Sequence, residues 1–112
     1  MATTKEYHEF VMDQLARMGN FSSRRMMGEY CIYHGGKVIG LLCDNVFMIK
    51  PTDSVLRLMP YAERAYPYEG SRTLMVVVDE IENTELLSQV LAAQYTELPE
   101  PKEKRPSGRK AR

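Results

Sequence analysis

The chain has 112 residues, of which 44% are hydrophobic and 27% charged, and its formal net charge is zero. These values are typical of one globular domain and exclude a chain that is disordered or apolar throughout. The longest apolar run of note, at positions 74–78, is far shorter than the roughly 20 residues that cross a bilayer, so we expect no membrane span.

The N-terminal segment predicts a helix rather than an export signal. Three charged residues within the first nine positions interrupt the apolar stretch that an export signal needs, so we expect a cytoplasmic protein. Thr3 and Glu6 have the spacing of a capping box, and apolar residues then recur at helical spacing as far as Met18. Gly19 suits a C-terminal cap, which predicts a helix over residues 4–18.

Three strands of a meander are expected next, over residues 25–34, 37–43 and 46–50. The pair Gly35 and Gly36 supplies the positive φ angles of a two-residue hairpin turn, and a second turn follows at positions 44 and 45. With that loop length, Cys31 would face Gly40, and Cys31 and Cys43 would lie on opposite faces of the sheet.

Apolar residues occur on both faces of these expected strands, so the sheet needs two covers. Helices can supply one of them. The other is a further helix, a second copy of the chain in a homodimer, or a protein ligand. Met26 and Met27 stand just before the meander, where adaptable thioether side chains would suit a partner surface, although they could equally fill the core.

The cysteines and histidines of the chain do not form a convincing reactive site. A metal held by Cys31, His34 and Cys43 would need three ligands that converge on one ion, whereas Cys31 is expected to project away from the other two. A nucleophilic cysteine would need an imidazole in reach, and His8 lies beside the apolar stripe of the first helix. The acidic residues at positions 79, 80 and 82 cluster in a turn, where solvation or a following helix N-terminus accounts for them. We therefore expect no metal, no cofactor and no enzymatic activity.

The remaining elements are a helix over 54–59 capped by Asp53, a short edge strand at 66–70, an apolar strand over 72–80, and a final helix. Asn83 or Thr84 caps that helix, which should stop before Pro99. The order α-β-β-β-α-β-β-α contains no βαβ alternation. It predicts an α+β fold, a two-layer sandwich with an antiparallel sheet.

Residues 100–112 differ in charge from the rest of the chain. They contain six basic residues against two acidic ones, a net charge of +4, while residues 1–99 contain nine basic and thirteen acidic residues, a net charge of −4. We expect a domain over 1–99 followed by a disordered basic tail. The tail gives the alternative function, weak and non-specific nucleic-acid binding. Its basic residues are Lys102, Lys104, Arg105, Arg109, Lys110 and Arg112.

The stretch RRMMGEYCIYHGGKVIGLLCDNVFMIKP at 24–51, followed by YPYEG, an apolar strand and ELLSQVLAAQYTELPEPK, resembles the TfoX/Sxy family. The resemblance is to its N-terminal domain in single-domain members and covers nearly all of residues 4–102. The residues that carry it are Arg25, Met26, Gly28, Tyr30, Tyr33, Asp44, Lys50 and Pro51.

This resemblance implies a non-enzymatic regulator linked to natural competence, in which a protein partner belongs to the transcription machinery. It also implies a fold similar to that of type III secretion chaperones. On this analogy we place the partner-binding surface around Arg25, Met26, Met27, Tyr30 and Tyr68.

Overall fold

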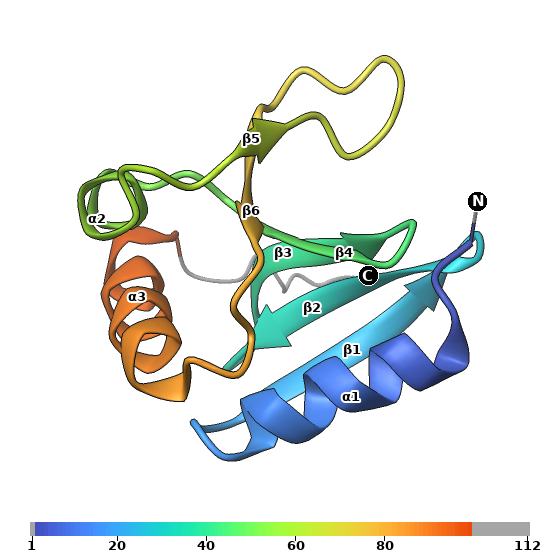
Figure 1. Cartoon of the computed structure of the whole chain (residues 1–112), viewed down its shortest axis with the longest axis horizontal. Helices are drawn as coiled ribbons and strands as arrows, with labels where there is room; N and C mark the ends of the chain where they lie inside the picture. The colour runs from blue at the N-terminus through green and yellow to red at the C-terminus, as the bar shows by residue number, and fades with distance from the viewer. Residues whose placement is uncertain (1, 100–112) are drawn as a thin grey trace, which may run out of the picture.

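The computed structural model describes residues 2–99 and has an α+β fold built on one six-stranded antiparallel sheet (Figure 1). The strands lie in the order β1-β2-β3-β4-β6-β5, so β1 and β5 form the two edges. The elements are α1 (Lys5–Ala16), β1 (Phe21–Met26), β2 (Glu29–His34), β3 (Lys37–Cys43), β4 (Val46–Ile49), α2 (Asp53–Leu58), β5 (Arg64–Ala65), β6 (Met75–Val78) and α3 (Thr84–Glu97). The predicted fold class is therefore confirmed.

All three described helices pack on one face of the sheet, and α2 stands beside α3 (Figure 1). Their buried residues join those of the strands in a single main core. Its fully buried members include Val11 and Leu15 from α1, Val90 from α3, and Ile32 and Phe47 from the sheet. None of the described helices has the length and apolar character that crossing a membrane requires.

The structure contains one strand more than the sequence predicted. The segment before Met27, expected to be mostly a linker, is β1, and it pairs with β2 through a turn in which Met27 and Gly28 have φ angles of 52° and 86°. Two consecutive positive φ angles are typical of a tight hairpin turn. Methionine is an unusual residue at the first of these positions. Because this turn interrupts the chain between Met26 and Glu29, the single strand predicted over 25–34 is wrong. The observed order is α-β-β-β-β-α-β-β-α.

The pairing between β2 and β3 also differs from the prediction. Tyr33 pairs with Val38 as expected, but the register then shifts, so that Cys31 pairs with Leu41 rather than with Gly40. Ile39 is the extra residue of this irregularity. Paired residues share a face, and so do alternate residues of one strand. Both cysteines therefore lie on the same face, and the predicted opposite orientation is wrong.

Gly40 allows β3 and β4 to approach closely beside this shift. A Cβ added at Gly40 would lie 2.1 Å from the carbonyl oxygen of Met48 and 2.9 Å from the Cα of Ile49. Both contacts are with the backbone, which cannot rotate away as a side chain would. Glycine is therefore required here by the close approach of the neighbouring strand.

The second half of the chain follows the predicted order with shifted boundaries. Thr52, rather than Asp53, caps α2, and its hydroxyl accepts a hydrogen bond from the N–H of Val55. The predicted edge strand at 66–70 lies instead at Arg64–Ala65, since its pairing is limited to two residues of β6. The predicted cap of the last helix at Asn83 is confirmed. The proposed tail, 100–112, lies outside the described residues.

The start of the chain is fastened to two turns of the sheet. Glu29 accepts hydrogen bonds from the N–H and the hydroxyl of Thr3, at 3.0 and 2.6 Å, and from the N–H of Asp44. Asn45 accepts one from the N–H of Thr4. Thr4, not Thr3, is the N-cap of α1, because the side chain of Thr3 is engaged by Glu29. We call this network the N-terminal clasp.

The face of the sheet opposite the helices carries a second apolar cluster, made of Cys43, Met48, Met75 and Val77. Val77 and Met48 form a cross-strand pair, whereas the adjacent pair of Val78 and Phe47 belongs to the helix side. The prediction of two apolar faces is thus confirmed within the described residues. The described helices contribute no residue to this second cluster.

Candidate interaction site

Four of the five predicted partner-binding residues lie on the β1–β2 hairpin, but not on one surface. Arg25 and Tyr30 are a cross-strand pair on the helix side, where the Tyr30 ring is stacked on the His8 ring at 3.7 Å. Met26 is 47% exposed at the end of β1, and Met27 is fully exposed in the turn. Tyr30 is therefore half-buried against α1, while the two methionines are accessible.

Tyr68, the fifth predicted residue, lies far along the sheet from this hairpin. It follows β5, at the sheet edge opposite to β1, and it is exposed. Tyr66 and Leu74, on the same connection between β5 and β6, are also exposed. The structure therefore places the predicted residues at two separate locations.

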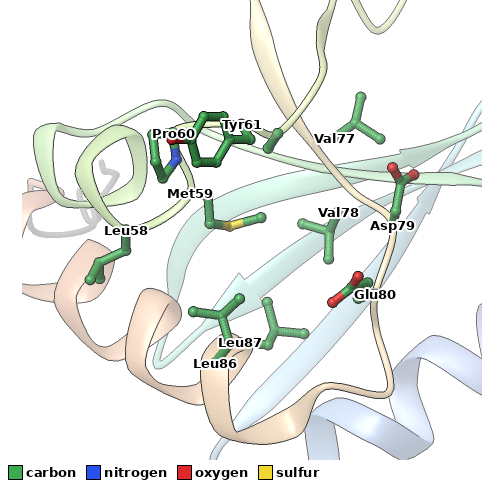
Figure 2. Close-up of a pocket in the computed structure, with 11 residues that line it drawn as sticks. Leu58, Met59, Pro60, Tyr61, Val77, Val78, Asp79, Glu80, Leu86 and Leu87 are labelled. Carbon is green, nitrogen blue, oxygen red and sulfur yellow. The ribbon is translucent and has the colours of Figure 1, made fainter.

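A pocket that the sequence did not reveal lies between the end of α2, the end of β6 and the first turns of α3 (Figure 2). Its volume is about 370 Å³, which is within the usual range of ligand and anchor-residue pockets, roughly 300–1,000 Å³. It is lined by Leu58, Met59, Pro60, Tyr61, Ala62, Val77, Val78, Asp79, Glu80, Leu86 and Leu87. We call it the α2–α3 pocket.

Local chemistry explains why this pocket exists. Pro60 follows α2 closely and cannot continue a helix, so the chain leaves α2 and crosses to β5 at residues 59–62. Glu97 of α3 accepts hydrogen bonds from the N–H and the hydroxyl of Ser54, which ties the start of α2 to the end of α3. These bonds lower the pKa of Glu97. The two helices are therefore held together at the end remote from the pocket.

The walls of the pocket differ in polarity. Figure 2 shows Met59 and Leu86 directed into the space beside Val78, with Asp79 and Glu80 on the other side of it. Both carboxylates are exposed, and neither forms an ion pair with another residue in the described range 2–99. The pocket therefore combines an apolar interior with a negatively charged rim.

Tyr61 completes the rim and is 99% exposed. Its ring lies above Met59 in Figure 2, without cover from other described elements. Large aromatic residues at this degree of exposure beside an apolar hollow are typical of binding surfaces. Sequence reasoning took the acidic residues after β6 for a solvated turn, and it had no signal that they line the same pocket as Tyr61.

A larger hollow of about 710 Å³ lies between strand β3 and the 67–73 segment. Leu41 and Met75 contribute apolar side chains to it, and Tyr68 is the exposed aromatic of its wall. Its remaining lining is made largely of loop residues.

The two imidazoles serve packing roles in the structure. The Nε2 atom of His8 is 2.7 Å from the hydroxyl of Ser23, which links α1 to β1, and the His34 ring is stacked on that of Phe21 at 4.0 Å. Burial lowers the pKa of both histidines, so the neutral form is favoured at neutral pH. Burial likewise raises the pKa of Cys43, which disfavours its thiolate.

No metal-binding cluster of three or more His, Cys, Asp or Glu residues occurs within the described part of the chain. Cys31, His34 and Cys43, which the sequence analysis considered as metal ligands and set aside, do not come together in one such group. Lys37, which lies beside His34 in the hairpin, is buried and donates to the backbone oxygens of Tyr95 and Leu98 at the end of α3. It caps that helix.

Comparison with known proteins places most of this chain in one family. The profile described as "TfoX N-terminal domain" matches residues 13–100. An uncharacterized 12.7 kDa protein from the trpE 5′ region of Spirochaeta aurantia is 36% identical over 102 residues, covering 91% of this chain and 89% of that protein. No solved structure matches the chain significantly.

Proposed function

Because this chain belongs to the TfoX N-terminal domain family, we propose that it is a non-enzymatic regulatory domain that acts by binding a protein partner. The observation that carries the proposal is the α2–α3 pocket, an accessible apolar hollow with a fully exposed tyrosine on its rim. Met26 and Met27 give a second accessible apolar site at the β1–β2 turn. Exposed apolar groups of this kind are typical of protein interaction sites.

The regulated process in this proposal is of the competence type, with the partner drawn from the transcription machinery. The support for this is the resemblance to the TfoX/Sxy family alone. The relative from Spirochaeta aurantia is uncharacterized and adds no role. Protein binding and the competence role are therefore separate proposals.

Affinity capture tests protein binding. Full-length protein is immobilised and exposed to nuclease-treated cytosol, and bound proteins are identified by mass spectrometry. The first variant is Met26→Asp/Met27→Asp. A matched control, Gln89→Asp/Ala92→Asp, adds the same two charges at exposed positions of α3.

We expect one or more transcription regulators or polymerase subunits to be enriched by the wild type and the matched control. Loss of that enrichment in the methionine variant would assign the contact to the β1–β2 turn. Retention would leave the α2–α3 pocket as the contact. If the wild type enriches nothing over an unrelated bait of similar charge, protein binding is rejected.

The alternative, nucleic-acid binding through the six basic residues of 100–112, is favoured by the +4 charge of that segment. The −4 charge of residues 1–99 opposes it. Binding would be weak, would not depend on sequence, and would decrease steeply with salt.

A further inference from the structure

The α2–α3 pocket has features that restrict what can occupy it. Its interior is formed by aliphatic side chains and by Met59, whose unbranched thioether adapts to different shapes. The two buried side-chain atoms without a hydrogen-bond partner in the described residues, the Nδ1 of His34 and the Oε1 of Gln94, do not belong to residues that line it. The interior therefore selects for apolar character and size.

Selectivity must come instead from the rim. Asp79 and Glu80 place two exposed negative charges at one side, and both belong to the short connection that leads into α3. A cation that binds there keeps much of its contact with water, so no buried charge has to be desolvated. Tyr61 offers an uncovered aromatic ring to a cation as well.

An occupant must reach both the apolar interior and the charged rim to use these features together. A peptide segment does this readily, because neighbouring residues can direct one side chain into the hollow and others along its edge. A nucleic acid would meet like charge at Asp79 and Glu80 and is disfavoured.

We propose that the α2–α3 pocket binds a segment of a partner protein that presents one large apolar side chain flanked by lysine or arginine. The apolar side chain enters between Met59 and Leu86, and the basic residue lies against Asp79 and Glu80. This inference rests on the proposed function and gives it a site and a partner chemistry.

The test is selection from a library of short random peptides displayed on phage, with the full-length protein as bait. We expect the enriched peptides to combine a large apolar residue with lysine or arginine. Synthetic copies should bind Asp79→Asn/Glu80→Gln about tenfold more weakly than the wild type, a change that corresponds to two exposed ion pairs. Raising the salt concentration should weaken wild-type binding far more than binding to this variant.

Tyr61→Ser is the second test variant, chosen because a fully exposed side chain does not support the fold. It should also weaken binding about tenfold, because the partner segment would lose the contact area of an exposed aromatic ring at the rim. The matched control is Glu6→Gln/Glu9→Gln, which removes two exposed carboxylates from α1 and should leave binding unchanged. Circular dichroism establishes that all variants are folded.

Three results would overturn the inference. They are an absence of enriched peptides, a consensus without basic residues, and binding that is equal in the wild type and in both pocket variants. A partner captured from cytosol that still binds both pocket variants would remove this site while leaving the proposed function intact. Conversely, peptide binding without any captured protein would reject the proposed function.

Discussion

Replacing Gly40 by alanine should remove a large part of the folding free energy. The new methyl carbon would lie 2.1 Å from the carbonyl oxygen of Met48, about 1 Å closer than such atoms approach in proteins. Met48 lies on β4, which is hydrogen-bonded on both sides, to β3 and to β6. The strand cannot move away from β3 without breaking part of the ladder.

The cost follows from these contacts. Overpacking of a core typically costs about 1–3 kcal/mol. Opening two ladder hydrogen bonds adds roughly 0.5–1.5 kcal/mol each. The expected loss is therefore about 2–6 kcal/mol, a large share of the roughly 5–15 kcal/mol that stabilises an ordinary domain. The melting temperature of a domain of this size should fall by about 15–30 °C.

Gly70→Ala is the matched control. Gly70 has a φ of +89°, but a Cβ there would have no atom within 4 Å, so only the backbone strain of about 1–3 kcal/mol applies. Urea denaturation followed by circular dichroism measures both variants. A Gly40→Ala protein no less stable than Gly70→Ala would show that β3 and β4 do not approach as described.

Three further predictions concern stability, pH and nucleic acid. Lys37→Met should lower the free energy of unfolding, measured by urea titration, by about 2 kcal/mol, because the Lys37 Nζ donates at 2.8 and 3.0 Å to two carbonyl oxygens at the end of α3. The control Lys5→Met, at an exposed position, should change the free energy of unfolding little. Burial lowers the pKa of His8 and His34, so the unfolded chain takes up protons first as the pH falls, and the urea midpoint should decrease from about pH 7 to 5. His8→Gln/His34→Gln should flatten this dependence, and an unchanged slope would contradict the assignment. Truncation after Pro99 should abolish the weak binding of duplex DNA measured by fluorescence anisotropy at low salt, and equal binding by both chains would reject a role for 100–112.

The sequence predicted those elements in which local pattern and tertiary packing agree. Helical spacing identified α3 because Leu87, Val90, Leu91 and the fully buried Gln94, which recur at that spacing, face the core. The glycine pair at 35 and 36 identified the β2–β3 turn for a similar reason, since both residues have positive φ angles.

The parts that were missed depend on information that lies outside the local pattern. Strand β1 is an edge strand with two serines and two arginines, so it lacks apolar alternation. The register shift at Ile39 lies beside Gly40, where β4 approaches closely, and a comparison of β2 and β3 alone does not include this third strand. The α2–α3 pocket joins residues 58–62 with residues 77–87, and no spacing rule connects Tyr61 with Glu80.

The N-terminal clasp has a consequence for how the family can vary. The side chains of Thr3 and Glu29 meet although they lie 26 positions apart, and those of Thr4 and Asn45 meet across 41 positions. A substitution at one member of either pair leaves the polar group of the other without this counterpart, so natural selection should tend to replace the two together. Homologues that carry glycine at the position of Glu29 should accordingly show a different residue at position 3, and a change at position 45 should accompany one at position 4, so that such covariation would record the clasp in the sequences themselves.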